Sequence, residues 1–102
     1  KLQLRMCFDI SHSMLTANNF GYCFYELCEQ IAPLTAHLHI GDAEGLNGEG
    51  LQIGEGSIDF PRTGKILNSL APSASFIPEI WQGHKNDGEG FWKALDILEK
   101  VL

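Results

Sequence analysis

Three short apolar runs alternate with segments of helical periodicity along this chain, and this rhythm limits the folds open to it. The apolar runs stop at polar residues and are too short for helices, which predicts strands. The segments between them repeat apolar residues at spacings of three and four, which predicts amphipathic helices. Strands that alternate with helices form parallel sheets through right-handed crossovers. An α/β fold of the order βαβαβα is therefore expected, with elements at residues 2–10, 18–31, 36–40, 59–70, 75–80 and 91–102.

Proline and glycine punctuate this pattern. Pro33 is expected to close the first helix, and Pro61 suits the first turn of the second helix. Residues 41–56 hold six of the chain's 11 glycines, which predicts an irregular loop. Long ordered loops in compact domains are often functional, so this loop either covers a substrate or is simply flexible.

Size and composition narrow the class of protein. The 102 residues, 44% of them hydrophobic, suffice for one modest core, so residues 1–102 are expected to form a single domain. The 13 acidic and 7 basic side chains give a charge of −6 with no basic run, which disfavours a nucleic-acid partner. Three cysteines without C-x-x-C spacing are typical of a reducing compartment, which predicts a cytoplasmic protein. No apolar run is long enough to span or target a membrane.

Residues able to bind a metal lie near the end of each predicted strand. Asp9 lies near the end of the first strand and His12 three residues later, His39 lies in the second strand, and Glu79 lies in the third. The loops at the carboxyl ends of parallel strands lie together, so these side chains are expected to converge. Oxygen ligands suit Mg²⁺ and Mn²⁺, and an imidazole also suits Zn²⁺ or Co²⁺.

Each of these residues also has a plainer interpretation. Asp9 and His12 form a strand-ending turn if the aspartate only caps backbone amides. His37 shares a strand face with His39, and we interpret it as a lining histidine held by a hydrogen bond. Glu79 stands in an apolar strand, where a buried carboxylate must be neutral, paired or metal-bound.

Four motifs lie in order along the chain, at residues 7–12 (CFDISH), 37–43 (HLHIGDA), 54–59 (GEGSID) and 77–80 (IPEI). In order and separation they resemble the sixth to eighth strands of the xylose isomerase-like superfamily, which includes sugar-phosphate isomerases and epimerases and endonuclease IV. The resemblance covers nearly the whole chain. It implies that residues 1–102 are the last three strand-helix units of a TIM barrel, a partial domain, because eight such units take about 250 residues.

The resemblance also implies roles for individual residues. Asp9, His39 and Glu79 would be metal ligands, His12 would contact the substrate, and Glu79 would also act as acid or base. The substrate would be a sugar or sugar phosphate, and the cofactor Mn²⁺, Mg²⁺, Zn²⁺ or Co²⁺. A carboxylate would move a proton between carbons through an enediolate. The family's further carboxylate ligand lies on the preceding strand, so isomerase or epimerase activity is expected only if the complete barrel is present.

Two other functions remain open. The chain is a catalytically inactive association module of a larger enzyme if its exposed sheet edges pair with the missing part of the barrel or with a second copy. Repair of DNA as in endonuclease IV is less favoured, since that enzyme's Asp-x-His ligand pair aligns with Gly48 and Gly50 here.

Aromatic and basic residues follow the third predicted strand. Trp81, His84 and Lys85 lie directly after it, and Trp92 lies in the last predicted helix. They either contact an anionic sugar, with the indole stacked on it, or form an aromatic cluster that packs the last helix.

Overall fold

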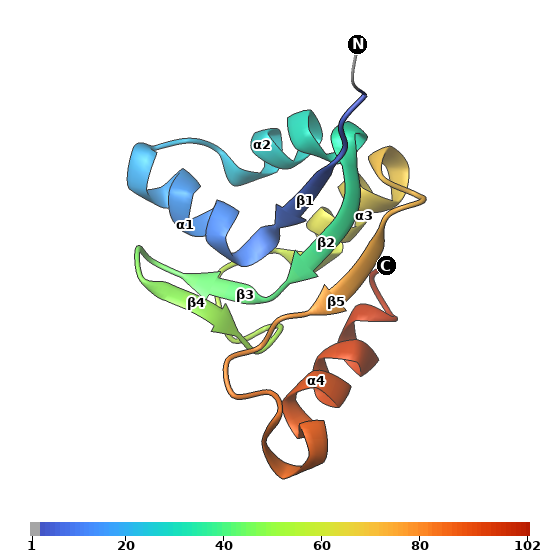
Figure 1. Ribbon diagram of the computed structural model, residues 1–102. Coiled ribbons are helices and arrows are strands. Elements are labelled where there is room, and N and C mark those ends of the chain that lie inside the picture. The colour runs from blue at the N-terminus through green and yellow to red at the C-terminus, as the bar shows by residue number, and fades with distance from the viewer. Residues whose placement is uncertain (1–2) are drawn as a thin grey trace.

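The computed structural model describes residues 3–102, which form an α/β domain with a parallel sheet (Figure 1). Strands β1, β2 and β5 form a three-stranded parallel sheet in the order β1-β2-β5, and β3 pairs with β4 in an antiparallel hairpin. No closed barrel is formed by the described residues. The elements are β1 (Met6–Asp9), α1 (Ile10–Phe20), α2 (Phe24–Ile31), the 3-10 turn η1 (Ala32–Leu34), β2 (Thr35–Ile40), β3 (Asp42–Glu44), β4 (Gly48–Leu51), α3 (Phe60–Leu70), β5 (Ser75–Pro78) and α4 (Lys85–Leu98).

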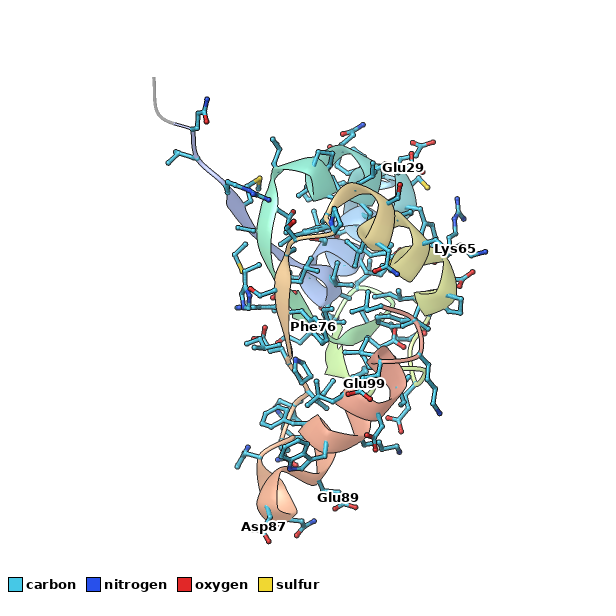
Figure 2. The ribbon with its side chains drawn as sticks, turned by 90° about the vertical axis from the view of Figure 1, so that its right-hand side faces the viewer. Glu29, Lys65, Phe76, Asp87, Glu89 and Glu99 are labelled. Carbon is cyan, nitrogen blue, oxygen red and sulfur yellow. The ribbon has the colours of Figure 1, made fainter. Side chains whose placement is uncertain are left out.

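The two faces of the parallel sheet differ because side chains alternate along a strand. Phe8, Leu38 and Ile40 are buried on the face that packs against the helices. Figure 2 views the molecule from the side, with the strands at one side and the helices at the other. The opposite face carries His37 and His39 and is not covered by any described element, as their partial exposure indicates.

The first helical region differs from the prediction. One helix was expected at residues 18–31, whereas α1 begins directly at Ile10 and α2 is a second, separate helix. The Asp9 side chain caps α1 by accepting a hydrogen bond from the His12 amide, so the strand ends earlier than expected. Gly21 ends α1 in the left-handed conformation, with φ of 74°. Residue 2 of the expected strand lies outside the described part of the chain.

The glycine-rich segment is more regular than expected, because it contains the β3–β4 hairpin. Asp42 is fully buried at the start of β3, and its carboxylate accepts four backbone N–H groups. Two of these donors, Gly54 and Gly56, lie beyond the hairpin, and the third distant donor is Ile58. One buried carboxylate thus holds residues 42–58 together, including residues 52–56, which lie outside any helix or strand as expected.

The remaining elements agree closely with the expected order. Helix α3 begins at Phe60 with Pro61 in its first turn, and β5 begins at Ser75 as predicted. The backbone of α4 is not helical at residues 86–88, so its regular part starts near the expected residue 91. Trp81 and Trp92 are 74% and 66% exposed, so they do not form the aromatic cluster that was one interpretation. Among residues 3–102, no helix has the length and apolar character needed to cross a bilayer.

Candidate metal centre

Asp9, His39 and Glu79 meet at the carboxyl ends of the three parallel strands. Asp9 lies directly opposite His39 in the β1–β2 pairing. The Glu79 amide donates to the Ile40 carbonyl at 2.8 Å, which extends the pairing of β2 and β5 by one residue. One ligand atom from each of the three side chains lies within 4.8 Å of the other two. The structure therefore brings together the three residues predicted from the sequence as ligands.

His39 and Glu79 have the spacing of two ligands of a small divalent ion. His39 Nδ1 lies 2.9 Å from Glu79 Oε2. Two ligands at right angles around one ion, with bonds of about 2.1 Å, lie about 3 Å apart. A hydrogen bond between an imidazole and a carboxylate has the same length, so this pair can either bind an ion together or share a hydrogen bond. Two carboxylates and one imidazole leave further coordination positions for substrate or for ligands from elsewhere.

Glu79 is more accessible than the sequence indicated. We expected a carboxylate inside an apolar strand, but β5 ends at Pro78 and the Glu79 side chain is 53% exposed. Glu79 is therefore accessible to solvent and substrate while remaining beside His39.

His12 lies between two carboxylates at the edge of the metal centre. Its Nδ1 lies 2.8 Å from Asp9 Oδ2, and its Nε2 contacts Glu49 Oε2. The hydrogen bond to Asp9 raises the pKa of His12; the charge of Asp9 and the contact with Glu49 act in the same direction, and partial burial opposes them. Asp9 thus combines a capping role, through the His12 amide, with a place in the metal centre.

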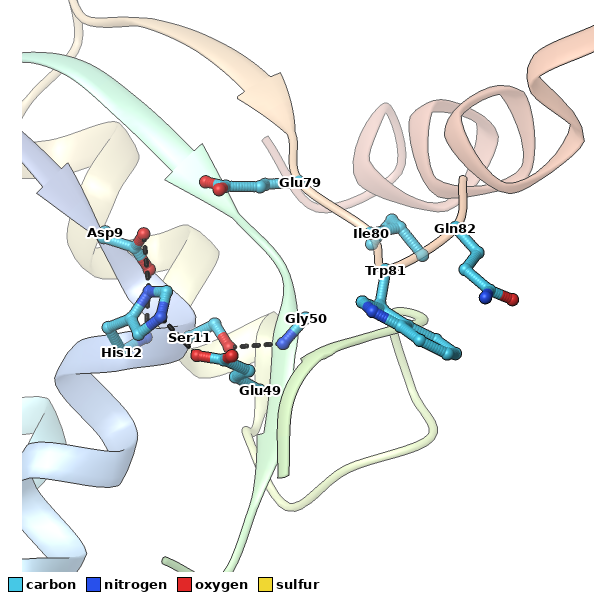
Figure 3. Close-up of a pocket in the computed structure, with 9 residues that line it drawn as sticks. All are labelled: Asp9, Ser11, His12, Glu49, Gly50, Glu79, Ile80, Trp81 and Gln82. Carbon is cyan, nitrogen blue, oxygen red and sulfur yellow. Dashed lines mark hydrogen bonds and ion pairs between the residues drawn. The ribbon is translucent and has the colours of Figure 1, made fainter. Parts of the chain in front are cut away.

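A pocket of about 300 Å³ opens beside these residues (Figure 3). Its walls come from the end of β1, the first turn of α1, strand β4, and the segment that follows β5. The lining residues are Asp9, Ser11, His12, Glu49, Gly50, Glu79, Ile80, Trp81 and Gln82. His39 completes the ligand group although it does not line this pocket. His84 and Lys85, which were candidates for substrate contacts, do not line it either.

Glu49 lines the pocket, but the sequence did not predict it as a site residue. It stands between Gly48 and Gly50 in a segment that was expected to be irregular. The hairpin brings it to His12, and Ser11 ties the two segments by accepting from the Gly50 amide and donating to the Asp42 carbonyl. A charged residue flanked by glycines gives no signal of this contact by itself, because the contact is created by the pairing of β3 with β4.

His37 behaves as predicted for a lining histidine. Its Nδ1 lies 2.8 Å from the Ser75 hydroxyl on the neighbouring strand. Its ring meets that of His39 edge to face, with centroids 5.2 Å apart. His37 is not part of the three-residue ligand group. Its ring packs against that of His39 from two positions earlier on β2.

The sequence was compared with protein-family models and with curated proteins, and neither comparison found a relative. No protein-family model matches the sequence, and no curated protein matches it either.

Proposed function

We propose that this chain is part of a divalent-metal-dependent sugar or sugar-phosphate isomerase or epimerase domain. In this proposal its three parallel strands are the last three strand-helix units of a xylose isomerase-like TIM barrel. The observation that carries the proposal is the group formed by Asp9, His39 and Glu79, whose ligand atoms lie within 4.8 Å of one another at the carboxyl ends of the strands. Active sites of such barrels lie at that end.

The roles of the residues follow from their positions. A bound divalent ion supplies positive charge that polarises a substrate carbonyl. Glu79 is half exposed at the pocket and is placed to move a proton between neighbouring substrate carbons through an enediolate. His12, held between Asp9 and Glu49, lies at the pocket wall and would contact a substrate oxygen by exchanging its contact with Glu49 for one with the substrate. Asp9 and His39 complete the ligand set.

The rest of the barrel would supply the remaining walls and a further carboxylate ligand. Within residues 3–102, β1 and β5 each pair on one side only, which suits strands that continue into a larger sheet. The three cysteines are unpaired, which fits a reducing cytoplasm. DNA repair is less favoured because the pocket carries three carboxylates and the chain is acidic.

A second candidate function is an inactive association module of a larger enzyme. The specific observation in its favour is the uncovered sheet face together with the two unpaired strand edges. Such edges pair readily with another chain. This function requires no ion at Asp9, His39 and Glu79, so metal binding separates the two candidates.

Calorimetric titration of Mn²⁺ into the full, chelator-treated chain tests the proposal. Asp9→Asn removes a ligand charge but retains an N-cap residue, and Asp59→Asn is its matched control at the cap of α3. Glu79→Gln is matched by Glu44→Gln, an exposed residue outside the pocket. We expect about one ion per chain, bound at least about tenfold more weakly in Asp9→Asn and Glu79→Gln and equally well in both controls. A folded chain that binds no ion would instead support the association module.

A further inference from the structure

The charges around the pocket point to the kind of substrate that it accepts. Asp9, Glu49 and Glu79 place three carboxylates on its lining, and neither lysine nor arginine is among the lining residues. The two nearby histidines are already paired, His12 with Asp9 and Glu49, and His39 with Glu79. A phosphate dianion in this pocket would therefore meet three carboxylates and no lysine or arginine that could balance its charge.

Trp81 gives the pocket an exposed aromatic wall. Its side chain is 74% exposed, although an indole of this size is usually covered in a folded domain. Its backbone amide donates to the Gly50 carbonyl at 2.8 Å, which fixes the start of the side chain against β4. Figure 3 shows the indole on the opposite side of the pocket from His12. An anchored aromatic ring at a pocket rim suits the C–H face of a carbohydrate.

Gln82 adds a neutral polar group next to Trp81. Its backbone is left-handed, with φ of 57°, a conformation that costs energy for a residue other than glycine. Backbone strain of this kind concentrates at ligand sites. The amide of Gln82 both donates and accepts hydrogen bonds, which matches hydroxyl groups.

We infer that this pocket binds the uncharged polyol part of a sugar and excludes a phosphorylated end, with Trp81 as the stacking surface and Glu49 as the charge that repels anions. The inference rests on the proposed function and narrows its substrate from sugars and sugar phosphates to neutral sugars. Lys93 lines a neighbouring hollow beyond Trp81, where it shares the wall with Glu55, so this cation has an acidic neighbour and lies outside the pocket itself.

The test compares D-fructose with D-fructose 6-phosphate, which differ only by the phosphate, on the full Mn²⁺-loaded chain by calorimetry. We expect fructose to bind at least about tenfold more tightly than its phosphate ester. The same titrations of Glu79→Gln, which has lost a metal ligand, correct for Mn²⁺ that binds the ester in solution. Trp81→Ala should weaken fructose binding about 3- to 10-fold, whereas Trp92→Ala, at the other exposed tryptophan, should leave it unchanged.

Glu49 is tested by its effect on selectivity. Glu49→Gln should reduce the ratio of the affinities for fructose and its phosphate ester. Glu44→Gln makes the same change of charge on the same hairpin and should leave this ratio unchanged. If Mn²⁺ does not bind at all, the proposed function and this inference both fail. If Mn²⁺ binds but the ester binds as tightly as fructose, or Trp81→Ala and Trp92→Ala have equal effects, only the inference is overturned. Circular dichroism of each variant verifies that the chain remains folded.

Discussion

Asp42 has the most demanding environment of any charged residue in the described chain. It is fully buried, and no cationic side chain bonds to it. Its two carboxylate oxygens accept the amides of Ala43, Gly54, Gly56 and Ile58 at 2.8 to 3.1 Å. The residue therefore fixes the backbone on both sides of the hairpin that delivers Glu49, and the site depends on it although Asp42 does not line the pocket.

Replacement of Asp42 should destabilise the fold strongly. Asp42→Ala leaves four backbone donors without their partner, and we expect the free energy of unfolding to fall by at least about 3 kcal/mol. Asp59→Ala is the control, since Asp59 accepts one amide at an exposed helix cap and should cost about 1 kcal/mol. Urea unfolding followed by circular dichroism measures both. If the free energy of unfolding falls equally in the two variants, the four hydrogen bonds of Asp42 do not contribute the stability expected of them.

The ligand group could be predicted from the sequence, whereas the rest of the pocket could not. Asp9, His39 and Glu79 lie at strand ends, and parallel strands bring their ends together whatever the loops do. The contact of Glu49 with His12 spans 37 positions and exists only because the hairpin folds back over α1. No local pattern encodes such a contact, so the third carboxylate of the pocket lining emerged only from the structure.

Cys28 should be the least reactive of the three thiols. It is buried in α2, and burial raises the pKa of its thiol to about 12, with nearby Cys23 and Glu29 acting in the same direction. Cys7 and Cys23 are exposed. With a thiol reagent in mild base we expect two thiols to react in the folded chain and the third only after denaturant is added. Fast reaction of all three without denaturant would contradict the burial of Cys28.

The raised pKa of Cys28 also makes the stability of the fold depend on pH in basic solution. The pKa of Cys28 is raised in the folded chain from an ordinary value of 9.0, so its stabilising effect is complete below about pH 9. Above that pH the unfolded chain loses the proton first, and stability falls as the pH rises toward 12. Cys28→Ala removes this thiol, so the variant should lose less stability than the unchanged chain as the pH rises. Urea unfolding midpoints of both proteins, measured below and above pH 9, test this expectation.

At the scale of elements, the predictions failed where a cap or a buried side chain overrides the apolar pattern. Residues 18–31 have helical periodicity throughout, yet Gly21 breaks the segment and Asp9 starts a helix that the polar run at residues 11–13 concealed. Six glycines suggested an irregular loop, but Asp42 organises them around a hairpin. Helix α3 and strand β5 were predicted well because Pro61 and an apolar run mark them locally.

Gly64 in α3 offers a test in which packing and helix propensity act in opposite directions. Alanine favours helices over glycine by about 1 kcal/mol. A Cβ at Gly64, however, would overlap the carbonyl oxygen of Val101, where the C-terminal segment crosses α3. We expect Gly64→Ala to destabilise the fold by about 1–3 kcal/mol. Ser69→Ala on the exposed side of α3 is the control and should be neutral or slightly stabilising. Stabilisation by Gly64→Ala would mean that the C-terminal segment moves aside freely.

At the scale of the whole molecule, the sheet is covered on one face and open at both edges. Its buried face is formed by residues such as Phe8, Leu38 and Ile40, and the helices complete that core. Strands β1 and β5 each have a neighbour on one side only within the described chain. The alternation of strands and helices was enough to predict this parallel sheet.

The open edges predict self-association of the isolated chain. Ile77 is 46% exposed on the edge strand β5, and burying it against a second copy removes apolar surface from water and pairs the strand's free groups. Ile77→Lys should raise the dissociation constant at least about tenfold, because an ammonium group in such an interface is costly to desolvate. Leu46→Lys is the control, since Leu46 is similarly exposed at 57% but lies in the hairpin turn away from the sheet edge. Sedimentation velocity across a wide concentration range measures both. A chain that stays monomeric throughout, or equal effects of the two lysines, would exclude the sheet edge as the contact.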